Sequence, residues 1–139
     1  MFMGIVKWLI YYVYKHSKIY VTDLSLCSPS SFVFSEDTDR LAENVVAIEL
    51  FRRGYEVWYW KKAHEIDFVA KRQNIAELLL INVCFTSEIP DRETKGFAEF
   101  REEFPDIPVH QLILTEDFAG VLEGISCVPL WKWLTGTPC

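Results

Sequence analysis

The sequence predicts an α/β fold in which helices cover a mixed central β-sheet. Apolar residues at helical spacing after position 40 are followed by three β-rich segments, and a second helical pattern after Pro90 precedes another strand. This order of helix, three strands, helix and strand is typical of a layered α/β domain. The chain has 139 residues, half of them apolar, and we assign residues 18–139 to one domain with its own core.

Residues 1–17 are interpreted as a separate apolar helix that packs on this domain. The large side chains of one helical stripe are Phe2, Ile5, Leu9, Tyr12 and Val13. Contact with a partner protein and association with a membrane surface are the alternatives. A membrane-spanning helix needs roughly 20 apolar residues, about twice the length of this run. Because Lys7 also interrupts the run, no membrane partner is predicted.

The first half of the domain contains one clear helix. Residues 18–23 predict a short strand or extended segment, and the serine-rich residues 24–39 predict a loop. A helix is expected to begin near Arg40 and to end at Gly54, with Asp37, Thr38 or Asp39 as its cap. The apolar residues of this helix that recur at helical spacing are Leu41, Val45, Ile48 and Phe51.

Three strands and a turn are expected next, over residues 55–60, 65–71 and 75–85, with the turn at 72–74. Residues 78–83 are almost continuously apolar, which is typical of a central strand covered on both faces. After Pro90 a second helix is predicted, with Asp91 or Thr94 as its cap. Two further strands, at 109–114 and 125–129, and a terminal helical turn at 130–134 complete the domain.

The composition argues against several properties without excluding a nucleic-acid function. The net charge of −6 argues against the broad positive surface on which nonspecific DNA binding depends. The four cysteines form no CxxC pair, so a structural zinc site is not predicted. Reduced thiols in a cytoplasmic protein are expected instead.

A set of polar residues falls on neighbouring elements of this fold. Glu43 lies on the first helix, Asp67 on the second strand, and Asn82 and Cys84 on the third. Residues i and i+2 of a strand share a face, so Asn82 and Cys84 point the same way. Paired carboxylates at one sheet edge are the hard oxygen ligands that Mg²⁺ or Mn²⁺ requires in a phosphodiester-cleaving centre.

Five ordered segments carry a resemblance to a known family: IYVTD at 19–23, the long run LAENVVAIELFRRGYEVWYW at 41–60, EIDFV at 65–69, INVC at 81–84 and VPLW at 128–131. These segments resemble the PD-(D/E)XK nuclease-like domain at the C-terminal end of many archaeal and bacterial AAA-type ATPases, an uncharacterised family. The resemblance implies a restriction-endonuclease-like three-layer sandwich, with a mixed central sheet flanked by helices.

The resemblance also assigns residue roles. Glu43 matches the helix acid and Asp67 the hairpin acid, whereas Asn82 and Cys84 stand where the family motif IEVK has Glu and Lys. The implied metal ligands are Glu43, Asp67 and Asn82, with weak affinity for Mg²⁺ or Mn²⁺ because an amide brings no charge. A neutral thiol cannot replace an ammonium, and Lys95 of the next helix is a candidate replacement. No nucleotide is expected to bind this chain.

Each of these residues also has a purely structural interpretation. Asp67 is either a metal ligand or a carboxylate that accepts hydrogen bonds from neighbouring amides, and Glu43 is either a ligand or part of a solvated helix face. For Lys95 the structural interpretation, a solvated helix residue, is favoured over the replacement of the missing lysine. Glu65 is expected to pair with Lys61 or Lys62 rather than to bind a metal.

Three functions follow as hypotheses. The leading one is a nuclease-like domain that is catalytically weakened or inactive and acts as a nucleic-acid-binding or structural module. The alternatives are a divalent-metal DNA endonuclease that uses Glu43, Asp67 and Asn82, and a protein-interaction or dimerisation module. The expected partners are accordingly DNA, a second copy of the chain or an ATPase.

Overall fold

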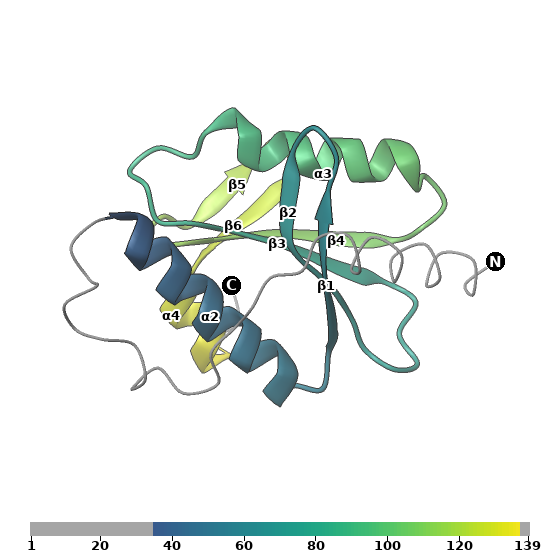
Figure 1. Cartoon of the computed structure of the whole chain (residues 1–139), viewed down its shortest axis with the longest axis horizontal. Helices are drawn as coiled ribbons and strands as arrows, with labels where there is room; N and C mark the ends of the chain where they lie inside the picture. Colours follow the sequence, from purple (N-terminus) through teal and green to yellow (C-terminus); the bar gives the residue numbers. More distant parts are fainter. Residues whose placement is uncertain (1–34, 137–139) are drawn as a thin grey trace.

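The computed structural model describes residues 35–136, which form three layers with a sheet between helices (Figure 1). The predicted helix at 1–17 and the segment at 18–23 lie outside the described residues. The helices and strands in chain order are α2 (Ser35–Arg52), β1 (Glu56–Lys61), β2 (Glu65–Lys71), β3 (Leu78–Cys84), α3 (Asp91–Glu103), β4 (Val109–Thr115), β5 (Gly120–Leu122), β6 (Ile125–Pro129) and α4 (Leu130–Thr135).

The six strands form one mixed sheet in the order β1-β2-β3-β4-β6-β5. β1, β2 and β3 are antiparallel neighbours, β3, β4 and β6 run parallel, and β5 returns antiparallel to β6. Helices α2 and α4 pack on one face and α3 covers the other (Figure 1). The predicted α/β three-layer sandwich on a mixed sheet is therefore confirmed.

Strand β3 lies in the middle of the molecule and contributes to the core on both faces. Leu80 and Cys84 pack with Phe97 and Phe100 of α3, whereas Ile81 and Val83 join the cluster under α2. This burial on both sides explains the continuous apolar sequence of the strand.

The helix α2 differs from its prediction in two ways. It begins at Ser35 rather than near Arg40, so Asp39 is not its cap; the Asp39 carboxylate instead accepts a hydrogen bond from the Phe85 amide at 3.2 Å. The buried stripe is also displaced from the predicted one, since Phe51 is 55% exposed. The residues that face the sheet are Ala42, Val46, Ala47 and Leu50. The two alanines allow close approach of the helix to the strands.

Other differences concern the ends of elements. The third strand begins at Leu78 and not at residue 75. At this start the Leu78 amide donates a hydrogen bond to the Pro108 carbonyl. The predicted caps of α3 are wrong, because Pro90 precedes the helix and no side chain caps it; the Thr94 hydroxyl donates to the Asp91 carbonyl within the first turn. The short strand β5 is not predicted by the sequence pattern.

A partly buried ion cluster connects α2 to α4. The Glu49 carboxylate accepts hydrogen bonds from Arg52 (2.7 Å and 2.6 Å) and from Arg53 (2.7 Å). Arg53 also donates to the Trp133 carbonyl at 2.7 Å and lies over the Trp133 ring. The hydrogen bonds from Arg52 are the largest cause that lowers the pKa of Glu49 to about 2.

Glu49→Gln is expected to lower the free energy of unfolding by about 1–2 kcal/mol at pH 7, because the charged hydrogen bonds to both arginines are weakened. A carboxylate with a lowered pKa stabilises the fold above its unfolded value, near 4.5, and loses this contribution as the pH falls toward about 2. Urea denaturation should therefore give a difference from wild type that shrinks below pH 4.5. Glu102→Gln at an exposed position of α3 is the control, with no such pH dependence.

Candidate functional site

Asp67 lies at an irregularity of the sheet. Trp58 pairs with Val69 and Trp60 with Ile66, so Asp67 and Phe68 together oppose the single residue between the two tryptophans. Such a β-bulge redirects a side chain that regular pleating would place elsewhere. The Asp67 carboxylate accepts a hydrogen bond from the Val83 amide at 2.9 Å, which holds it near the start of β2 beside β3.

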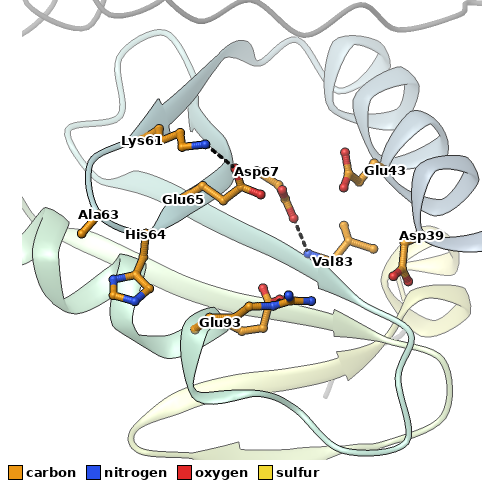
Figure 2. A pocket seen from close by; sticks show the side chains of 10 residues that line it. Asp39, Glu43, Lys61, Ala63, His64, Glu65, Asp67, Val83 and Glu93 are labelled. Atoms are coloured by element: carbon orange, nitrogen blue, oxygen red, sulfur yellow. Dashed lines mark hydrogen bonds and ion pairs between the residues drawn. The ribbon is translucent and has the colours of Figure 1, made fainter. Parts of the chain in front are cut away.

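Asp67 and Glu43 line one pocket, which we call the acidic pocket; its volume is about 360 Å³. Figure 2 shows Glu43 reaching in from α2 and Asp67 from β2. The lining residues are Asp39, Glu43, Lys61, Ala63, His64, Glu65, Asp67, Val83, Arg92 and Glu93. The two acids that the sequence singled out are thus brought to the same site from separate elements.

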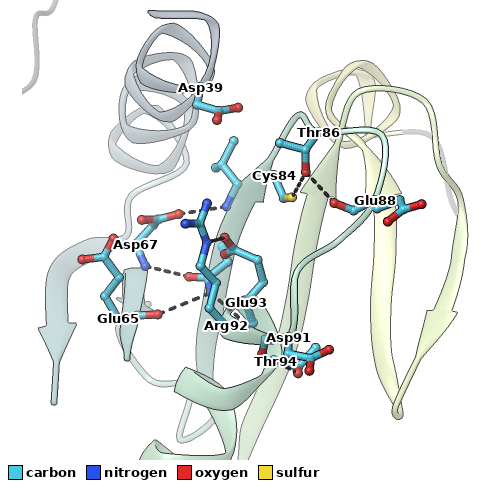
Figure 3. Close-up of polar contacts among 12 residues, drawn as sticks. Asp39, Glu65, Asp67, Cys84, Thr86, Glu88, Asp91, Arg92, Glu93 and Thr94 are labelled. Atoms are coloured by element: carbon cyan, nitrogen blue, oxygen red, sulfur yellow. Dashed lines mark hydrogen bonds and ion pairs between the residues drawn. The ribbon is translucent and has the colours of Figure 1, made fainter. Parts of the chain in front are cut away.

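Asn82 lies behind this pocket rather than in it. The side chain is 1% exposed, and its Oδ1 accepts the Asp67 amide at 2.8 Å. Its Nδ2 donates to two backbone carbonyls, that of Glu93 at 3.0 Å and that of Glu65 at 3.4 Å (Figure 3). One amide therefore joins β2, β3 and the first turn of α3.

A carboxylate at position 82 would not fit these contacts. The carbonyl oxygens of Glu65 and Glu93 both accept hydrogen bonds from Nδ2 of Asn82, and an ionised acid has no donor to replace it. Asn82 satisfies all three backbone groups at once because it carries both an acceptor and two donors. Its role in this structure is to connect three elements.

Cys84 and Lys95 are both outside the acidic pocket. Cys84 is buried in the core beneath α3, with its sulfur 3.1 Å from the Thr86 hydroxyl, which in turn donates to the Glu88 carbonyl (Figure 3). Lys95 is exposed on α3 and is not among the residues that line the pocket. The cation that α3 contributes is Arg92, whose Nε lies 3.2 Å from Glu93.

The pocket holds more carboxylates than cations. Glu65 forms the expected ion pair with Lys61 at 3.9 Å and also accepts the Tyr59 hydroxyl. Burial is the largest cause that raises the pKa of Glu93, and the nearby charge of Asp67 adds to it, while Arg92 acts in the opposite direction. Burial likewise raises the pKa of Tyr59, assisted by its hydrogen bond to Glu65.

Sequence reasoning missed four residues of this pocket. Asp39, His64, Arg92 and Glu93 belong to it, and His64 is tied to α3 by its ring nitrogen and its amide, which lie 2.5 Å and 3.0 Å from the Glu99 carboxylate. Burial would raise the pKa of Glu99, but the hydrogen bonds from His64 outweigh it and the net direction is downward. The acidic and basic residues at the start of α3 were the available signal, because the first turn of a helix that follows β3 faces the same sheet edge.

The donor set fits a divalent ion poorly. Mg²⁺ and Mn²⁺ require several convergent oxygen ligands, whereas the oxygen of Asn82 already accepts the Asp67 amide. Within residues 35–136, no three histidine, cysteine, aspartate or glutamate side chains are arranged so that they could hold a metal ion. We therefore derive no chemical step through a metal.

No helix between residues 35 and 136 is long and apolar enough to cross a membrane.

The chain is similar to two proteins that are themselves uncharacterised. It is 32% identical over 133 residues to the uncharacterised protein MJ1544 of Methanocaldococcus jannaschii. The aligned region covers 85% of this chain and 29% of the relative. It is 34% identical over 96 residues to an uncharacterised protein of Haemophilus influenzae. The aligned region covers 66% of this chain and 22% of the relative. The chain thus spans less than a third of the length of either relative.

Residues 38–133 match the family described as the domain of unknown function DUF4143. The match includes most of α2 with Glu43, the β2–β3 pair with Asp67 and Asn82, and most of α4. It also includes β1 with Lys61 and α3 with Arg92 and Glu93, so every residue that lines the acidic pocket lies within the match. The chain belongs to the DUF4143 family.

Proposed function

We propose that this chain is a nuclease-like domain of the PD-(D/E)XK type whose catalytic centre is inactive or weakened, and that it serves as a structural module. The hydrogen bonding of Asn82 carries this proposal. The third acid of the family motif IEVK is expected to be available as a metal ligand. Here the side-chain amide of Asn82 takes its place and is hydrogen-bonded to backbone groups of Asp67, Glu65 and Glu93. A residue that holds three elements together cannot also turn toward a substrate.

The charge of the acidic pocket favours a structural role over nucleic-acid binding. Five carboxylates, from Asp39, Glu43, Glu65, Asp67 and Glu93, line it beside the cations of Lys61 and Arg92 and the imidazole of His64. A phosphate would meet net repulsion unless a cation screened it. The net charge of −6 for the whole chain acts in the same direction.

Cleavage assays on linear, nicked and branched DNA with Mg²⁺ or Mn²⁺ test the inactive centre. We expect wild-type protein to cleave no faster than Asp67→Asn and Glu43→Gln. Both substitutions preserve side-chain shape, so that loss of folding does not imitate loss of activity, and circular dichroism verifies the fold of each.

Metal-dependent cleavage by the wild type that either substitution abolishes would overturn the proposal in favour of the endonuclease alternative. Arg92, which reaches the pocket from α3, would then be the first residue to replace with glutamine. Fluorescence anisotropy with labelled duplex and single-stranded DNA near physiological salt measures the binding alternative. We expect an affinity no tighter than that of an acidic control protein.

The resemblance adds expectations about partners. The relatives are several times longer than this chain, and an ATPase attached to or associated with the domain is the partner that the resemblance implies. A second copy of the chain is the other. A cytoplasmic location is part of the same proposal.

A further inference from the structure

A second cavity lies at the carboxyl ends of the parallel strands β3 and β4, apart from the acidic pocket. We call it the loop cavity; its volume is about 660 Å³. It is lined by the loop that follows β3, residues 86–89, by residues 115–118 that end β4 and begin the next turn, and by Leu122 of β5. The carboxyl end of a parallel sheet is where open α/β folds place their ligands.

One side-chain hydrogen bond within each loop supports the walls of the loop cavity. The Thr86 hydroxyl donates to the Glu88 carbonyl at 2.6 Å and fastens one loop. The Thr115 hydroxyl donates to the Phe118 carbonyl, also at 2.6 Å, and fastens the other. Cys84 and Thr115 are direct partners in the parallel register, so both loops leave the sheet at the same level. A preformed site of this kind lowers the entropic cost of binding.

Most of the surface of the loop cavity is apolar. Ile89, Phe118 and Leu122 line it, and Phe118 remains 52% exposed. Gly120 makes room for the Phe118 ring, since a Cβ at that position would lie 3.0 Å from the ring carbon Cζ. The neighbouring Val121 of β5 is 71% exposed, which extends the apolar surface along the edge of the sheet.

Every charged side chain that lines the loop cavity is acidic. Glu88, Glu116 and Asp117 are all exposed, and none of the three forms an ion pair with another residue in the described range 35–136. In the acidic pocket, by contrast, Lys61 and Arg92 lie among the carboxylates. The loop cavity thus combines an apolar floor with unneutralised negative charge at its rim.

We propose that the loop cavity is a docking site for a basic segment of a partner protein, which places an apolar side chain against Phe118 and lysine or arginine residues beside Glu88, Glu116 and Asp117. The complementary charge of the rim selects a cationic partner. The exposed Val121 of β5 gives such a segment further apolar surface beside the cavity. This inference concerns a different part of the molecule from the acidic pocket and does not depend on the state of the nuclease-like centre.

Fluorescence anisotropy with a labelled hexapeptide of two lysines, leucine, tryptophan and two lysines tests the proposal on the full chain. The double substitution Glu116→Lys with Asp117→Lys should weaken binding about tenfold at low salt, because attraction at the rim becomes repulsion. The matched control is Glu56→Lys with Glu102→Lys, which changes the net charge equally at exposed positions elsewhere. Phe118→Ser should weaken binding by a similar factor without changing the charge.

Two further peptides distinguish docking in the loop cavity from the general attraction of any basic peptide to an acidic protein. One has glycine and serine in place of leucine and tryptophan, and the other has glutamates in place of the lysines; both should bind at least tenfold more weakly than the first. Equal affinity for the peptide without apolar residues, or equal effects of the two double substitutions, would overturn the proposal. A dimer by light scattering that Phe118→Ser dissociates would assign the loop cavity to a second copy and overturn it as well.

Discussion

Asn82→Asp is expected to lower the free energy of unfolding by about 3–5 kcal/mol at pH 7. The substitution keeps the shape of the side chain but replaces the donor Nδ2 with an oxygen. The carbonyl oxygens of Glu65 and Glu93 then lose their donor and face a buried negative charge. Only the hydrogen bond from the Asp67 amide is preserved.

The pH dependence of this variant supplies a second test. Burial against two carbonyls raises the pKa of an acid above its unfolded value. An acid with a raised pKa destabilises the fold above that pKa, and the penalty disappears as the pH falls and the acid is protonated. Urea denaturation should therefore show a difference from wild type that is large at pH 8 and smaller at pH 4.5.

The matched control is Asn74→Asp, the same chemical change at an exposed turn with a φ of 64°, which should alter stability by no more than about 0.5 kcal/mol. A similar small effect at position 82 would refute the structural role of Asn82. The double substitution Asn82→Glu with Cys84→Lys would return the side chains of the resembling motif. We expect that protein to lose stability instead of gaining cleavage activity, since both positions are buried and engaged.

Gly96→Ala is expected to lower the free energy of unfolding by about 2–3 kcal/mol. A Cβ at position 96 would lie 2.5 Å from the Glu65 carbonyl oxygen and 3.2 Å from the carbon. These are backbone atoms, which cannot rotate away, so α3 would have to move off the sheet. The Glu65 carbonyl also accepts a hydrogen bond from Asn82. Movement of α3 away from the sheet would disturb that hydrogen bond too.

The sign of this prediction is informative, because helix propensity alone acts in the opposite direction. Alanine is favoured over glycine within a helix by about 1 kcal/mol. Ala98→Gly, at an exposed position of the same helix, measures that propensity and should destabilise by about 1 kcal/mol. If Gly96→Ala stabilises the protein by a comparable amount in urea denaturation, the close packing of α3 on β2 is wrong.

Local patterns predicted much of the fold. The strands at 65–71 and 125–129 have the predicted bounds, since β-forming residues there are bounded by clear turn signals. The role of Asp39 was not predictable from nearby residues, because its carboxylate accepts a hydrogen bond from the amide of Phe85, 46 residues further along the chain. A long-range contact of this kind leaves no local pattern.

The candidate site was predictable only in part. Glu43 and Asp67 were found because the family motif fixes their positions, and the structure places both in one pocket. The sequence could not show that Asn82 turns inward, since its two acceptors come from β2 and α3. Lys95 was named as the candidate cation and Arg92 was missed, because the sequence does not show how α3 is rotated against the sheet. The packing of Gly96 against Glu65 fixes that rotation and leaves Lys95 exposed.

The turn between β5 and β6 has a consequence for solubility. Glu123 and Gly124 both have positive φ, 51° and 80°, which is the backbone of a tight hairpin with strong twist. β5 itself contains three residues, so it exposes only a few unpaired backbone groups at the border of the sheet. A short, twisted border is a poor template for strands of other molecules. The protein can therefore display Phe118 and Val121 to solvent with little tendency to polymerise or form amyloid through this edge.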